Sequence, residues 1–172
     1  MAATTSSATV KLSSKKAAAA KAEAFIKTLA RDYPQYKFKA GAQEHWSPRY
    51  KTVIYNPQQS LQELHYGVLH ELAHALLGHA DYSTDIELVK MEADAWEMAT
   101  EIAHRYHINI AHEHIQNCLD TYRDWLHQRS ACPSCGMHVL QKDSANYHCF
   151  NCQTEWKVSS GRFVRPYRRS VK

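Results

Sequence analysis

The chain has 172 residues, of which 44% are hydrophobic and 22% are charged, and it contains only five glycines and five prolines. This composition is typical of a globular protein and excludes a collagen-like, intrinsically disordered or coiled-coil chain. No apolar run approaches the roughly 18 residues that span a bilayer, and the N-terminus lacks the apolar stretch of a secretory signal, so we expect a cytoplasmic protein with no membrane partner.

Charge is distributed unevenly along the chain. Residues 1–22 carry four Lys and no acidic residue, residues 23–130 carry ten basic and fifteen acidic residues, and residues 131–172 carry seven and two. An acidic body with two basic ends indicates that the ends contact DNA, RNA or another polyanion, or that they serve only solubility.

The N-terminal part of the chain is expected to form a tail, a helix and a pair of strands. Residues 1–14 are small, Ser/Thr-rich and free of acidic residues, which predicts a disordered tail. Strong helix formers follow one another over Lys15–Asp32, and Pro34 ends that pattern. Tyr36–Ala40 alternates in polarity and Tyr50–Tyr55 is rich in β-branched and aromatic residues, which predicts antiparallel strands.

Three amphipathic helices are expected next. A capping box of Ser60 and Glu63 opens the first, which ends before Gly78. A second box opens the next helix at Thr84, and the third covers about residues 111–128. With the strands, these helices predict an α+β domain over residues 15–130.

The helix opened by Ser60 contains the sequence His70-Glu71-Leu72-Ala73-His74. Side chains at positions i and i+4 of a helix point the same way, so both imidazoles can bind one Zn²⁺. Glu71, about 100° around the helix from His70, can reach a water on the metal without binding the metal, which suits the general base of a hydrolase. The pattern therefore predicts a catalytic zinc site, which needs a third protein ligand.

Glu92 is the preferred third ligand. It lies eighteen residues after His74, on the next long helix, which a short loop folds back antiparallel to the first. His79 is nearer in sequence, but on a continuous helix it faces about 180° away from His70. The alternatives that stay open are His79, Glu87 and Asp94.

Four of the five cysteines form two Cys-x-x-Cys pairs, Cys132 with Cys135 and Cys149 with Cys152, separated by thirteen residues. Two such turns supply the four thiolates of a closed tetrahedral zinc site, whereas disulfides need an oxidising compartment. The pattern predicts a structural zinc ribbon over residues 131–159. Its short strands are expected around His138–Leu140, Tyr147–Phe150 and Thr154–Val158.

Residues 160–172 form a basic tail after the ribbon. Arginines of this kind contact phosphates, and the aromatic rings between them can stack on exposed bases, so the ribbon and tail are candidate contacts for DNA or RNA. A solvated tail is the alternative. The residues concerned are Arg162, Phe163, Arg165, Tyr167, Arg168 and Arg169.

The stretches HELAHALLGH and MEADAWEMA resemble the ImmA/IrrE group of zinc metallopeptidases, over about residues 51–103. The resemblance implies a zincin-like fold in which a small sheet packs on helices and the His-Glu-x-x-His motif lies on a central helix. It also implies that His70, His74 and Glu92 hold the zinc and that Glu71 is the catalytic glutamate. Members of the group are implicated in cleavage of repressor proteins in phage, mobile elements and stress responses.

Members of the group usually carry a DNA-binding or sensor module where this chain has the zinc ribbon. A zincin body followed by such a ribbon is similar to SprT-like proteases, which act on proteins near DNA. Those proteases carry a downstream His-Gly pair that this sequence lacks, so this resemblance ranks second. The sequence thus predicts a zinc-dependent endopeptidase with one catalytic and one structural Zn²⁺. Its substrate would be a repressor or a DNA-associated protein lying along the Tyr50–Tyr55 strand. The alternative is a nucleic-acid-associated adaptor whose zincin body is not catalytic.

Overall fold

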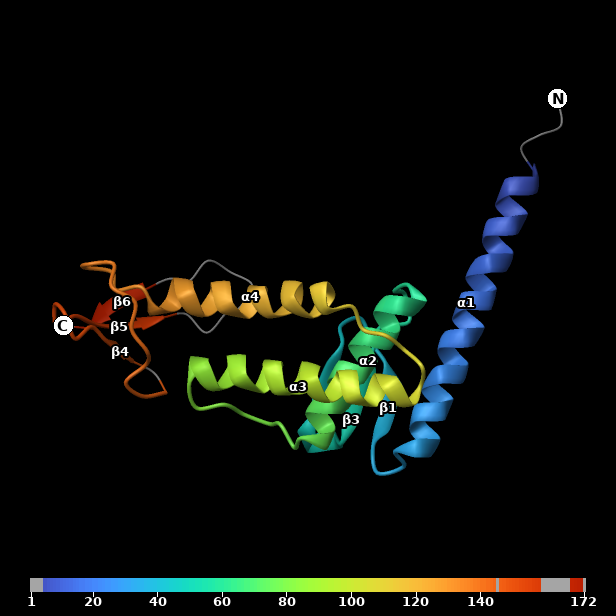
Figure 1. Ribbon diagram of the computed structural model, residues 1–172, viewed down its shortest axis with the longest axis horizontal. Helices are drawn as coiled ribbons and strands as arrows, with labels where there is room; N and C mark the ends of the chain where they lie inside the picture. The colour runs from blue at the N-terminus through green and yellow to red at the C-terminus, as the bar shows by residue number, and fades with distance from the viewer. Residues whose placement is uncertain (1–4, 145, 159–167, 172) are drawn as a thin grey trace. The chain divides into compact units, whose positions relative to one another are not determined.

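The computed structural model describes residues 5–144, 146–158 and 168–171 and has a mixed α+β architecture with small sheets (Figure 1). None of the helices in these ranges combines the length and apolar character that crossing a bilayer requires. The elements in chain order are α1 (Thr5–Asp32), β1 (Lys37–Ala40), β2 (His45–Ser47), the 3-10 helix η1 (Pro48–Tyr50), β3 (Thr52–Tyr55), α2 (Leu61–Leu76), α3 (Asp85–Arg105), α4 (His112–Ser130), β4 (Tyr147–His148), β5 (Glu155–Val158) and β6 (Arg168–Val171).

The chain divides into two compact units. The first comprises residues 1–80 and 97–109, and the second comprises residues 81–96 and 110–172. The first contains the β1–β3 sheet, and the second contains the β4–β6 sheet and the four paired cysteines.

Helix α1 begins ten residues earlier than the sequence predicts. It starts at Thr5, so residues 5–14 belong to the helix and the expectation of a disordered tail is wrong for them. These ten residues contain neither Gly nor Pro. Nothing in them stops a helix that the Ala-rich segment downstream favours, and Ser and Thr are tolerated inside one.

The first sheet has the strand order β1-β3-β2, and its pairing corrects two expectations. β1 runs parallel to β3, with Phe38 opposite Val53, so the predicted antiparallel pair is wrong. The chain reverses between β1 and β3 twice, because β2 lies between them in sequence and pairs antiparallel with β3. β3 is therefore the central strand and not an edge. A three-residue strand such as β2 is too short to show the alternation that identifies strands in a sequence.

Helix α2 forms as predicted and supplies much of the core of the first unit. The Ser60 hydroxyl accepts the Glu63 backbone N–H at 3.2 Å, and the Glu63 carboxylate accepts the Ser60 N–H at 3.0 Å, so the capping box is confirmed. The helix packs against β2 and β3 and against α1. Its fully buried side chains share one face, which fixes the rotation of the helix about its axis. They are Leu64, Val68, Leu69, Leu72 and Ala73.

The second unit contains a small sheet with the order β4-β5-β6, and both pairings are antiparallel. Buried Tyr147 and Trp156 stack with ring centroids 5.2 Å apart and form a core with Cys132 and Cys149. The strand expected around His138–Leu140 is reduced to a single bridge, between Ala131 and His138. The last part of the predicted tail is the strand β6, which pairs with β5.

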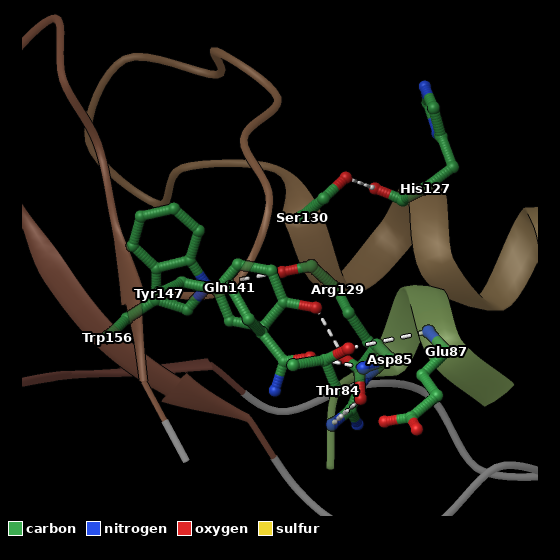
Figure 2. A network of polar contacts seen from close by, with 9 residues as sticks. All are labelled: Thr84, Asp85, Glu87, His127, Arg129, Ser130, Gln141, Tyr147 and Trp156. Carbon is green, nitrogen blue, oxygen red and sulfur yellow. Dashed lines mark hydrogen bonds and ion pairs between the residues drawn. The ribbon is translucent and has the colours of Figure 1, made fainter. Parts of the chain in front are cut away.

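A buried polar network joins the β4–β6 sheet to α3 and α4 within the second unit (Figure 2). Asp85, the first residue of α3, pairs with the Arg129 guanidinium at 2.5 Å and accepts a hydrogen bond from the Tyr147 hydroxyl. The Asp85 backbone N–H donates to the Gln141 side chain. The Arg129 carbonyl accepts the Trp156 indole N–H at 3.2 Å. The β4–β6 sheet is thus held to the helices by charge-assisted bonds away from water.

Candidate metal centres

The side chains of His70, His74 and Glu92 offer ligand atoms that all lie within 4.8 Å of one another. All three residues are buried. The two histidines lie one turn apart on α2, and their Nε2 atoms face each other at 3.2 Å. Two nitrogens bound to one tetrahedral zinc at about 2.05 Å lie about 3.3 Å apart. The residues present therefore fit a divalent metal ion that prefers nitrogen and carboxylate ligands, such as zinc.

The alternatives for the third ligand take other positions. Glu87 lies in the first turn of α3, where its carboxylate accepts the Ser83 backbone N–H at 2.7 Å. His79 contacts the opposite ring nitrogen of His74, Nδ1, at 2.8 Å. Within the described residues the metal-competent group includes Glu92 and contains none of the alternatives, Glu87, His79 and Asp94.

Glu71 is half-buried and is held against the sheet. Its Oε2 atom accepts the backbone N–H of Trp46 at 2.6 Å. Trp46 lies in β2, and its indole N–H donates to the His79 carbonyl at 2.9 Å. One residue of β2 therefore fixes both the Glu71 carboxylate and the backbone just beyond α2. Sequence reasoning missed Trp46, because its role depends on backbone atoms and on a strand with no pattern of its own.

Cys118, on α4, has a pKa that is raised first by burial and then by the negative charge of Glu92. The thiol therefore stays protonated at neutral pH and does not compete as an anionic ligand.

The second candidate centre consists of Cys132, Cys135, Cys149 and Cys152, whose sulfur atoms also lie within 4.8 Å of one another. Cys132 and Cys152 are 3.6 Å apart at sulfur, and Cys135 and Cys149 are 3.5 Å apart. A disulfide bond is about 2.05 Å long, so these sulfurs are not bridged. Four sulfurs held about 2.3 Å from one zinc ion lie about 3.8 Å apart. The arrangement fits a tetrahedral four-thiolate metal site.

Hydrogen bonds to two of these sulfurs, those of Cys135 and Cys152, favour the thiolate that a metal requires. The Thr154 hydroxyl lies 3.2 Å from the Cys152 sulfur, and this contact together with the Thr154 backbone N–H lowers the pKa of Cys152 to about 6. The backbone N–H of Met137 lowers the pKa of Cys135 in the same way. The Ser134 N–H points at Cys132 with a 3.4 Å separation. Donors around a sulfur stabilise its negative charge.

The four-cysteine segment exposes an aromatic side chain that sequence reasoning did not single out. Phe150 lies between two of the cysteines, is 79% exposed, and stacks on the His148 ring with centroids 5.3 Å apart and 16° between planes. The sequence feature that could have identified Phe150 is its position inside the second Cys-x-x-Cys pair. Among the predicted tail residues, Arg168 and Arg169 lie in β6. The others, Arg162, Phe163, Arg165 and Tyr167, lie outside the described residues.

Comparisons of the chain with protein-family models, with curated proteins and with solved structures give no match.

Proposed function

We propose that this protein is a zinc-dependent endopeptidase with a zincin-like body, similar to the ImmA/IrrE group. The observation that carries the proposal is that His70, His74 and Glu92 come together as one group of metal ligands. Glu71, the neighbour of His70 in the sequence, is not part of that group. Two histidines and a carboxylate are one of the ligand sets of catalytic zinc sites, which leave one position for substrate or water. The four-cysteine group is proposed to hold a second, structural zinc.

A zinc ion bound to His70, His74 and Glu92 would polarise a peptide carbonyl and lower the pKa of water. Glu71 acts as the general base, taking a proton from the attacking water and delivering it to the leaving amine. Its hydrogen bond from Trp46 holds the carboxylate in one orientation. The burial of both histidines limits competition from bulk water.

The proposed substrate is a protein segment in an extended conformation, and β2 is the strand that receives it. The sequence assigned this role to Tyr50–Tyr55, but β3 is paired on both sides. Within the described residues β2 pairs with β3 alone, so its other edge has no strand partner, and on that edge the Trp46 N–H is donated to Glu71. Added strands bind through backbone hydrogen bonds and tolerate varied side chains. Trp46 places this edge beside Glu71.

Glu71→Gln tests the proposal, with zinc content measured by elemental analysis and cleavage measured on dye-labelled casein. We expect the variant to keep its zinc and to lose at least about a hundredfold in cleavage rate, because the amide cannot accept a proton. Glu101→Gln, at an exposed position of α3, is the matched control and should cleave normally. Cleavage that survives in Glu71→Gln with unchanged zinc content contradicts the mechanism.

A second candidate function is contact with single-stranded nucleic acid through the ribbon. The exposed ring of Phe150, stacked on His148, offers a flat surface for a base. Residues 131–172 carry seven basic and two acidic side chains, which attracts phosphate. This function is compatible with the first, because the ribbon would deliver the peptidase to substrates on DNA.

Binding of a dye-labelled single-stranded DNA, followed by fluorescence anisotropy over a range of salt concentrations, tests this function. We expect affinity to fall steeply with salt, and Phe150→Ala to weaken binding by about 1–3 kcal/mol, the value of one stacked base. Leu140→Ala removes an exposed apolar side chain without a ring and serves as the control. Absent or salt-independent binding discards the idea.

A further inference from the structure

The end of α2 is built so that His79 folds back onto His74. Gly78 has a φ of +69°, in the left-handed region that ends helices. The Gly78 N–H bonds to the Ala75 carbonyl at 3.2 Å, and the His79 N–H bonds to the His74 carbonyl at 3.0 Å. These two bonds form a Schellman motif, in which the second residue after the C-cap returns to contact the last turn. On a continuous helix His79 would have faced away.

The backbone of His79 is therefore held from two sides. Its N–H is bound by His74, and its carbonyl accepts the Trp46 indole N–H at 2.9 Å. The ring that this backbone carries lies against the His74 ring, with centroids 5.0 Å apart, and the two Nδ1 atoms are separated by 2.8 Å. At that distance one Nδ1 donates a proton and the other accepts it.

The direction of this hydrogen bond follows from the other nitrogen of His74. That atom, Nε2, faces His70 Nε2 at 3.2 Å, so it is the nitrogen available to a metal. Nδ1 of His74 must then carry the proton and donate it to His79. A ligating histidine that donates its second N–H is held in one tautomer and one ring orientation, and its ligand nitrogen becomes more basic.

We propose that His79 is a positioning residue for the metal centre, which accepts the His74 Nδ1–H and so holds the Nε2 lone pair of His74 on the metal. The role rests on the proposed function, because it concerns the same metal centre. It affects the affinity for the metal, which can be measured without a cleavage assay. It replaces the role of third ligand that the sequence had left open for His79. Removal of such a partner costs about 10- to 100-fold in metal affinity.

The test compares His79→Leu, which has no acceptor, with His79→Asn, whose Oδ1 lies near the place of the histidine Nδ1. Co²⁺ is titrated into the full chain after the four-cysteine site has been filled with zinc. Binding is followed by visible absorption, because Co²⁺ bound to nitrogen and oxygen lacks the near-ultraviolet thiolate band. We expect the dissociation constant to rise about 10- to 100-fold in His79→Leu and to stay within about threefold of the wild type in His79→Asn.

Two results overturn the inference alone: equal affinity of His79→Leu and wild type, or equal losses in both variants. If the wild-type chain binds no Co²⁺ at His70 and His74, the proposed function fails together with the inference. Nitrogen-15 NMR of the zinc-loaded wild type gives a readout without any variant. Protonated Nδ1 on His74 with protonated Nε2 on His79 supports the assignment, and the opposite arrangement on His79 refutes it.

Discussion

The buried ion pair of Asp85 and Arg129 is expected to govern the stability of the second unit. The two side chains are only 4% and 7% exposed, and Arg129 also lies over the Trp125 ring at 4.5 Å. Asp85→Asn keeps the size of the side chain but leaves the guanidinium buried without a counter-charge. Breaking a buried pair in this way costs about 3–5 kcal/mol.

Urea unfolding of the zinc-loaded protein, followed by tryptophan fluorescence, measures this loss. With a slope of about 2 kcal/mol per molar urea, the midpoint should fall by about 1.5–2.5 M. Asp120→Asn breaks the exposed pair with Arg123 and is the matched control, with an expected loss below about 1 kcal/mol. A double variant, Asp85→Leu with Arg129→Met, should regain part of the stability, because no unpaired charge remains while the Tyr147 hydroxyl loses its acceptor. A midpoint for Asp85→Asn no lower than that of Asp120→Asn would refute the reasoning.

Three further predictions follow from local contacts. Ser60→Ala removes the side-chain half of the α2 capping box and should cost about 1 kcal/mol in urea unfolding, while Ser60→Gly costs only a few tenths; equal losses would argue against the cap. Burial raises the pKa of Glu44 above its ordinary value of 4.5. As pH rises through the raised pKa, the side chain ionises in the folded protein and the free energy of unfolding falls. Glu44→Gln should therefore raise the urea midpoint at pH 7, with a gain that shrinks as pH falls through the raised pKa towards 4.5, and a lower midpoint at pH 7 would contradict this. Cys149→Ser should lower the zinc content by one ion per chain, measured by elemental analysis, and should destabilise the second unit, measured by thermal melting. Unchanged zinc content would contradict a zinc site at the four cysteines.

Features that depend on short sequence separations were predictable. The i, i+4 spacing of His70 and His74 and the capping box of α2 follow from helix geometry alone, and the structure has both. The Cys-x-x-Cys pairs likewise bring their sulfurs together, because each pair lies in one tight turn. Periodicity located α2, α3 and α4 to within a few residues at each end.

Features that depend on distant segments needed the tertiary structure. Whether β1 and β3 run parallel depends on β2, whose three residues carry no alternation. The contact of His79 with His74 turned on Gly78, because one left-handed residue redirects the chain after α2. The hydrogen bond from Trp46 to Glu71 and the pair of Asp85 with Arg129 join residues 25 and 44 positions apart. A sequence pattern reports the neighbours along a helix or strand, whereas such contacts form only when packing of the apolar faces has placed the elements.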